Sequence, residues 1–392
     1  MKKTVATCLA ALLLFCASLQ PAAGHESKNA ETAKNNARIL AGTGNIYDHD
    51  DNTPQSYFVH REKAAQQGNP GAQFELGTLY FSGKGVNKDH AKAIQWMEEA
   101  ARHGHERSQL FLGMYYSGLT GAAKDSVLAK QWLEKAAQQG NAHAQFLLAG
   151  MYSDGQAIPK DYAVAVQWLE KAASQGFDQA QFSLASMYAS GRGVSQDLAK
   201  AAQLCEEAAR QGHAHAQFYL ARLYVSGQGV SQDFAKAAQW YEKAARQGLV
   251  GAQWSLGLLY FRGRGVSQDN ARGVHWTEEA ARQGHVQSQL LLGVYYFNEA
   301  AKGESQYYGV AKDWLEKAAQ QENPQAQLLL GTMYYGGTGV PADEGLARQW
   351  LEKAAQQGNE LAKAILPYLD ANVDISPLLQ KQDDTLLRSL GP

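Results

Sequence analysis

The sequence predicts an all-α fold, an α/α superhelical solenoid of about eight helix-turn-helix repeats. First, a glycine returns every 36 residues, with one step of 38 residues that reaches a glutamate instead: Gly68, Gly104, Gly140, Gly176, Gly212, Gly248, Gly284, Glu322 and Gly358. Second, a tryptophan keeps the same period at Trp96, Trp132, Trp168, Trp240, Trp276, Trp314 and Trp350. Third, the phrase WLEKAAQQGN occurs twice without change. Periods of this length are typical of stacked repeats rather than of independent domains.

The start of the chain predicts export. Residues 1–24 have the features of a signal peptide, with Lys2 and Lys3 followed by a short apolar stretch and by small residues before a cleavage site near Gly24. We therefore expect a periplasmic or secreted protein with no membrane span in the mature chain. Residues 25–56 are polar and lack periodicity, which predicts a disordered segment. Only Cys205 lies outside the signal peptide, so no disulfide can form within the mature chain.

Capping segments are predicted on both sides of the repeats. Residues 57–68 predict a half repeat that acts as a capping helix, and residues 359–370 predict a C-terminal capping helix that we expect to end before Pro367. The C-terminal tail, residues 371–392, either folds back on the last repeat or extends freely. Eight repeats are predicted between the caps: 69–104, 105–140, 141–176, 177–212, 213–248, 249–284, 285–322 and 323–358. One hairpin cannot bury its apolar stripe alone, so stability should come from stacking.

The first helix of each repeat carries a regular packing face. In GAQFELGTLYFSG, Ala72, Leu76, Gly77 and Tyr80 fall on one side at helical spacing. The position of Gly77 holds Gly or Ala in every repeat, which predicts a close approach between helices. A glutamine is equally regular, at Gln73, Gln109, Gln145, Gln181, Gln217, Gln253, Gln289 and Gln327. We expect its amide to bridge backbone groups of neighbouring hairpins; the alternative is that it lines a peptide groove.

The second helix is predicted to begin at an aspartate that caps its N-terminus. This aspartate lies seven residues before the tryptophan position, at Asp89, Asp125, Asp161, Asp197, Asp233, Asp269 and Asp343. In AIQWMEEAA, Ala93, Trp96 and the alanine pair share one face, and the glycine after the last turn suits a left-handed residue that ends a helix. The seventh repeat gains two residues, has Tyr307 at the cap position and Glu322 for glycine. There we expect a bulged loop or a local change of curvature, near Glu299–Gly309.

The order of these residues resembles a known family. The order is L-G-x-x-Y, G-x-G-V, D, A-x-x-W and A-A-x-x-G, as in GTLYFSGKGVNKDHAKAIQWMEEAARHG. This order resembles that of Sel1-like repeats, which are relatives of tetratricopeptide arrays. The resemblance covers about three quarters of the chain. The resemblance implies an α/α superhelix that acts as a protein-interaction scaffold, with its first helices on the concave surface. Cysteine-rich members associated with penicillin binding or hydrolysis carry a disulfide in each repeat. Because this chain keeps only Cys205, we do not expect that activity here.

No pattern in the sequence predicts catalysis. The net charge of −2, with both signs interspersed, excludes the basic footprint typical of nucleic-acid binding. The G-x-G turns join two helices and lack the strand of a dinucleotide motif. His103/His105 and His213/His215 are spaced so that their side chains diverge on a helix, and no metal-ligand spacing accompanies them. We expect a monomeric non-enzyme without cofactor or metal, which binds protein and not nucleic acid.

Candidate binding residues come from positions that differ between repeats. On the first helices, the positions equivalent to Glu75 and Thr78 vary freely, and several hold apolar residues where a solvated helix would be polar. We therefore predict a partner-binding strip of Phe111, Met114, His143, Leu147, His215, Tyr219 and Arg222. The alternative is that these are semi-buried contacts between hairpins.

The predicted function is a non-catalytic scaffold or adaptor, in the cell envelope or secreted, that binds a partner protein in the groove. One alternative is a cell-wall enzyme of the β-lactamase or penicillin-binding type, which a nitrocefin turnover assay would identify. Another is a peptidoglycan or glycan binder, whose aromatic side chains would stack on sugars.

Overall fold

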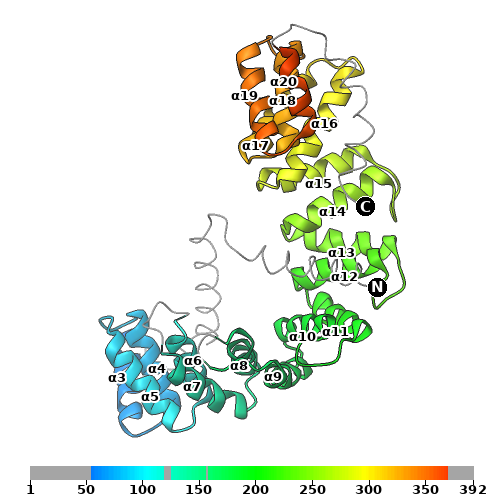
Figure 1. Cartoon of the computed structure of the whole chain (residues 1–392). Helices are drawn as coiled ribbons and strands as arrows, with labels where there is room; N and C mark the ends of the chain where they lie inside the picture. Colours follow the sequence, from blue (N-terminus) through cyan, green and yellow to red (C-terminus); the bar gives the residue numbers. More distant parts are fainter. Residues whose placement is uncertain (1–53, 119–124, 156–157, 370–392) are drawn as a thin grey trace. The chain divides into compact units, whose positions relative to one another are not determined.

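The computed structural model describes residues 54–118, 125–155 and 158–369 of the chain. In those ranges the chain forms eighteen α-helices and no strand (Figure 1). This confirms the predicted all-α helical-repeat fold. The predicted signal peptide, nearly all of the polar segment before the repeats and the C-terminal tail lie outside the described residues, as do the turns at 119–124 and 156–157. The helices belong to two compact units, divided between Gln175 and Gly176.

The first unit is a stack in which each helix packs against the next one along the chain. Even-numbered helices are the first helices of the repeats, and odd-numbered helices are the second helices. The first helices of the second and third repeats also contact each other directly. The bounds are α3 (Pro54–Gln66), α4 (Pro70–Ser82), α5 (His90–Arg102), α6 (Glu106–Tyr116), α7 (Ser126–Gln138), α8 (Ala142–Asp154) and α9 (Tyr162–Ser174).

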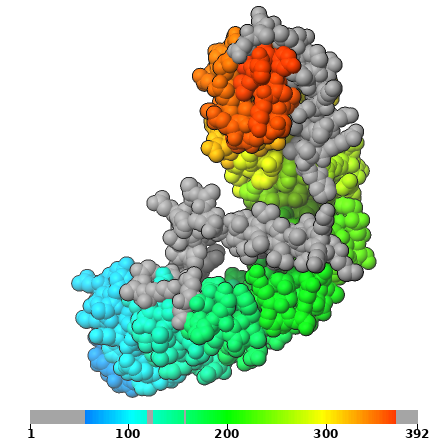
Figure 2. All heavy atoms as spheres, in the orientation of Figure 1, coloured from blue at the N-terminus to red at the C-terminus, as the bar shows by residue number. Residues whose placement is uncertain are grey.

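The second unit repeats this arrangement. Its bounds are α10 (Asp178–Ser190), α11 (Leu198–Arg210), α12 (Ala214–Ser226), α13 (Phe234–Arg246), α14 (Val250–Arg262), α15 (Asn270–Arg282), α16 (Val286–Ala301), α17 (Tyr307–Gln320), α18 (Pro324–Gly336), α19 (Glu344–Gln356) and α20 (Glu360–Leu369). Each helix again packs against the next. In the space-filling view the surface colour changes in sequence order along each unit, as this neighbour-to-neighbour packing requires (Figure 2).

The predicted aspartate caps are confirmed, and each also closes its hairpin. The side chain of Asp89 accepts a hydrogen bond from the backbone N–H of Lys92, at 3.0 Å. The backbone N–H of Asp89 donates to the carbonyl of Tyr80 on the first helix, at 2.9 Å. The other six capping aspartates make the same two kinds of bond. One residue therefore starts the second helix and ties it to the first.

The core of each repeat centres on the residue that follows the tryptophan position. This residue is at most 4% exposed in all eight repeats: Met97, Leu133, Leu169, Cys205, Tyr241, Thr277, Leu315 and Leu351. It faces the Gly or Ala position of the first helix, where a Cβ added to Gly113 would lie 2.6 Å from Leu133 Cγ. The close approach predicted at the Gly77 position is thus confirmed.

Five of the seven tryptophans lie nearer the surface than predicted, whereas Trp132 and Trp314 are buried, each 9% exposed. Trp96, Trp168 and Trp240 are only half-buried and pack at the edges of the core clusters. A lysine three residues later covers the ring in five repeats; Lys171 Nζ lies 4.0 Å from the ring centroid of Trp168. This cation–π contact accounts for the W-x-x-K spacing of the repeated phrase.

The seventh repeat absorbs its two extra residues in a helix. Its first helix, α16, has 16 residues, compared with 13 in α14. The bulged loop expected near Glu299–Gly309 is therefore wrong, because Glu299, Ala300 and Ala301 favour a helix and no G-x-G turn interrupts them. The second helix starts at Tyr307 without a side-chain cap.

The last helix continues past the proline at which we expected it to end. α20 includes Pro367 and ends at Leu369. A proline removes only its own N–H donor, and the helix ends two residues later, so little of the hydrogen-bond ladder is lost. Ala362, Ile365 and Leu369 are buried and form a cluster with residues of α18 and α19, which covers the end of the stack.

The buried glutamines confirm the predicted bridge, and the alternative of a groove lining is wrong. In seven repeats the glutamine Nε2 donates to an alanine carbonyl of the preceding second helix at 3.0–3.2 Å: Ala65, Ala101, Ala137, Ala209, Ala245, Ala281 and Ala319. In the remaining repeat, Gln181 Nε2 donates to Glu207 at 3.1 Å.

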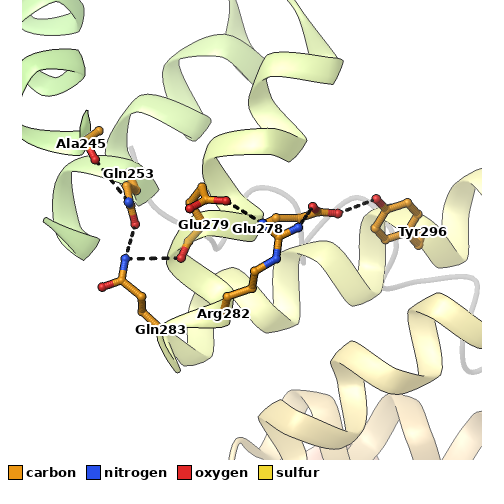
Figure 3. Close-up of polar contacts among 7 residues, drawn as sticks. All are labelled: Ala245, Gln253, Glu278, Glu279, Arg282, Gln283 and Tyr296. Atoms are coloured by element: carbon orange, nitrogen blue, oxygen red, sulfur yellow. Dashed lines mark hydrogen bonds and ion pairs between the residues drawn. The ribbon is translucent and has the colours of Figure 1, made fainter. Parts of the chain in front are cut away.

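The glutamine oxygen completes the bridge. It accepts from the glutamine that follows the second helix of the same repeat, as Gln253 accepts from Gln283 at 2.8 Å (Figure 3). Gln73 is the exception, because its oxygen faces the ring of His103 instead. A bridge such as that of Gln253 therefore links α13, α14 and α15 in one chain of hydrogen bonds.

Replacing Gln253 by Met should lower the free energy of unfolding by about 1–2 kcal/mol, because two largely buried hydrogen bonds are lost while the shape is kept. Urea denaturation measures this loss. Gln203→Met is the control, since Gln203 is an exposed residue of α11 and its loss should change stability by under about 0.5 kcal/mol. Equal stability of the two variants would show that the bridge contributes nothing.

Glu322 takes the place of the glycine that ends a second helix. The glycines of the 36-residue period have positive φ angles, such as 85° at Gly248. Glu322 has φ 63° and is the one non-glycine residue with positive φ in the described part of the chain. This conformation brings the side chain of an L-residue close to its own backbone.

Glu322→Gly should therefore stabilise the protein by about 1 kcal/mol. The reverse substitution, Gly284→Glu, places a side chain in the same conformation one repeat earlier and should destabilise by a similar amount. Thermal unfolding of both variants checks the pair, and a lower melting temperature for Glu322→Gly would contradict the explanation.

Three first helices are capped by histidines. Nδ1 of His105, His213 and His285 accepts a hydrogen bond from the backbone N–H three residues later, the role that asparagine has at Asn69 and Asn141. These bonds explain why histidine and asparagine alternate at this position of the repeat. Burial lowers the pKa of each ring below its usual value of 6.5. The folded state therefore favours the neutral ring, which is the form that can accept the bond.

Acid should weaken these caps. A lowered pKa in the folded state means that the stabilisation is complete above about pH 6.5 and is lost as the pH falls through the folded pKa. The triple variant His105→Asn, His213→Asn and His285→Asn should match the original chain at neutral pH and lose less stability at about pH 5. Chemical denaturation at both pH values measures the difference, and parallel losses would contradict it.

Candidate functional site

The seven predicted binding residues divide between the two units. Phe111, Met114, His143 and Leu147 belong to α6 and α8 of the first unit, and His215, Tyr219 and Arg222 belong to α12 of the second.

In the first unit, three of the four residues line a surface hollow on the first helices. The hollow has a volume of about 230 Å³. Its lining comes from α4, α6, α8 and the residue that caps α8: Phe74, Arg107, Leu110, Phe111, Met114, Asn141 and His143. The fourth predicted residue, Leu147, is half-buried and packs beside it against a core cluster that contains Leu110 and Met114.

The floor of the hollow is part of the core. Phe111 is 1% exposed and Met114 2% exposed. Phe111 meets the edge of Phe81, with ring centroids 5.4 Å apart, and stacks on Tyr115 at 6.2 Å. These two residues are therefore packing contacts between hairpins, as the alternative interpretation had it, and only their outer edges face the hollow.

The rim of the hollow is polar. Arg107 is exposed and forms no salt bridge with any residue that the structure describes. The adjacent carboxylate of Glu106 accepts a 2.6 Å hydrogen bond from the amide of Asn141. Burial lowers the pKa of His143, so that its ring is mainly neutral at pH 7. Of the residues that line the hollow, Arg107 is therefore the one that carries a full charge at neutral pH.

The sequence also distinguishes the position of Arg107 as one that varies between repeats. Arg107, His143 and His215 occupy the same position in successive or nearby repeats, where other repeats have Gly71, Gln179, Gly251, Gln287 and Gln325. That position varies as freely as the two on which the predicted strip was based. Phe74 and Leu110 were missed because a large apolar or aromatic residue follows the glutamine in every repeat and therefore predicts only packing.

In the second unit, the predicted residues gather around two phenylalanines. The ring of Phe182 on α10 lies 6.4 Å from that of His215 and 6.3 Å from that of Tyr219. Arg222 lies over Phe218 instead, at 5.9 Å from its ring centroid. His215 is exposed, and Tyr219 and Arg222 are half-buried. We call Phe182, His215 and Tyr219 the aromatic cluster of this unit.

The described residues offer little for chemistry. Among them, no group of three or more His, Cys, Asp or Glu side chains could hold a metal ion. Burial raises the pKa of the Cys205 thiol to about 12, so it is protonated at neutral pH and a poor nucleophile. None of the helices that the structure describes has the length and apolar character needed to cross a membrane.

Comparisons with known proteins identify the family of these repeats. The family model described as the Sel1 repeat matches residues 70–105, 107–141, 142–177, 178–213, 214–249, 250–285, 286–323 and 324–359. No relative was found among the curated proteins compared.

Two solved structures are similar over most of their lengths. One is a protective antigen present in uropathogenic Escherichia coli strains, 33% identical with a TM-score of 0.72, covering 87% of this chain and 72% of that one. The other is a Sel1 repeat protein from Oxalobacter formigenes, 34% identical with a TM-score of 0.60, covering 83% of this chain and 96% of that one. Together with the eight matched repeats, these similarities show that the chain belongs to the Sel1 repeat family.

Proposed function

We propose that this protein is a non-catalytic scaffold, exported to the periplasm or the cell exterior, that binds a partner protein through the surface of its first helices. Stacked helical repeats of this kind typically mediate protein–protein interactions. We expect the protein itself to be a monomer.

One observation carries the proposal: the first helices combine repeated buried residues with unrepeated surface residues. The buried glutamine and the small residue facing the core recur in every repeat, and they account for the packing of the stack. Arg107, His143, His215 and Tyr219 differ from their equivalents elsewhere, so the fold does not require them. In each unit, surface side chains that differ between repeats are suited to recognition.

The proposed location has two supports. Residues 1–24 have the features of a signal peptide. The similar protein from uropathogenic Escherichia coli is described as a protective antigen, a description that fits a protein accessible from outside the cell. A near-neutral net charge of −2 favours a protein partner over nucleic acid.

Site-specific photo-crosslinking tests the proposal. A crosslinking amino acid at His215, in the aromatic cluster, should give a discrete adduct with an envelope protein from the producing cells, whereas one at Gln239, exposed on the second helix α13, should give none. Tyr219→Ala should lower the affinity for the captured protein about tenfold, as is typical for a tyrosine at an interface, and Gln239→Ala should leave it unchanged. Equal adducts at the two positions, or none at either, would contradict binding through this surface.

A further inference from the structure

We propose that the hollow on α4, α6 and α8 binds an extended segment of the partner protein in which a leucine-sized apolar residue is followed directly by Asp or Glu. The apolar side chain enters the hollow and the carboxylate pairs with Arg107. This inference rests on the proposed function and specifies what one part of the surface recognises.

The size of the hollow favours one side chain of the partner over a small-molecule ligand. Pockets for small molecules and cofactors usually have about 300–1,000 Å³, which exceeds the volume of this hollow, about 230 Å³. One aliphatic side chain needs much less room than such a ligand. Phe74, Leu110, Phe111 and Met114 give it an apolar lining from two successive first helices. An aliphatic side chain that enters the hollow removes apolar surface from water, which favours binding.

The charge of Arg107 at the rim favours an acidic residue next to the apolar residue in the bound segment. Arg107 is exposed and has no ion pair in the described part of the chain. Glu106, the nearest carboxylate in sequence, is held by Asn141, and the His143 ring adds no positive charge at neutral pH. An arginine can form two parallel hydrogen bonds with one carboxylate, which favours Asp or Glu over other polar groups.

The fold does not explain the arginine. At the equivalent position, three other repeats have glutamine: Gln179, Gln287 and Gln325. Arg107→Gln is therefore a substitution that the repeat architecture already accepts, and it removes the charge without opening a cavity. Arg210→Gln, on an exposed second-helix residue of the other unit, makes the same change of charge and is the matched control.

Methionine methyl NMR of the chain from residue 25 to 392 provides the test. The only methionines in that chain are Met97, Met114, Met151, Met187 and Met333, so the Met114 signal can be assigned with a Met114→Leu variant. Three short peptides in a Gly/Ser background are titrated, containing Leu-Glu, Leu-Gln or Ala-Glu. The Leu-Glu peptide should shift the Met114 signal saturably with a Kd of about 1 mM, while Met333 in the second unit stays unchanged.

The charge and the apolar anchor are tested separately. Arg107→Gln should weaken the Leu-Glu peptide about threefold and leave the Leu-Gln peptide unaffected, whereas Arg210→Gln should change neither. The Ala-Glu peptide should bind more weakly than the Leu-Glu peptide to every variant. Equal binding of Leu-Glu and Leu-Gln, or an unchanged affinity in Arg107→Gln, would overturn the charge recognition.

Two further outcomes would also overturn the proposal. One is the absence of any shift of the Met114 signal while crosslinking at residue 215 still captures a partner. This result would exclude the hollow as a binding site and would leave the proposed scaffold function supported. The other is binding that appears only after residues 25–53 are deleted, which would identify this chain's own N-terminal segment as the occupant.

Discussion

The buried glutamine amide is the contact on which the rest of the structure depends. In the bridge drawn in Figure 3, the carbonyl of Ala245 accepts the amide of Gln253, and Gln283 donates to the oxygen of Gln253. The same carbonyl also accepts the Gly248 N–H that follows the end of the helix. Carbonyls near a helix C-terminus lack partners within the helix. The bond from Gln253 therefore uses a carbonyl at a helix end to tie one repeat to the next.

This arrangement separates the residues that hold the stack from those available for recognition. Caps, small residues and bridges recur with the 36-residue period, so each repeat is fixed by the same few contacts. Surface ion pairs such as Arg282 with Glu278 are exposed and contribute little to stability. The surface positions of the first helices are then free to differ, as the hollow in the first unit and the aromatic cluster in the second show.

Most of the fold could be predicted from the sequence, and less of the candidate site. The aspartate caps, the Gly or Ala notch and the glutamine bridge each follow from local spacing, and repetition makes the caps visible seven times and the other two features eight times. The hollow could not be predicted, because it depends on how side chains from three helices meet. Phe111 and Met114 lie on a first helix that is apolar on most sides, so periodicity did not show that they face the core. The extended α16 was missed because two inserted residues suggested a loop.

Packing between successive helices also limits how the gene can evolve. An in-frame duplication or deletion of 36 codons adds or removes a whole hairpin, and a glutamine such as Gln253 still finds an alanine carbonyl in the preceding helix and a glutamine donor after the next one. The number of hairpins can therefore change between related genes without harm to those that remain. An insertion of any other length has no such solution, and the chain must take it up within a single repeat, as the lengthened helix α16 does in the seventh repeat.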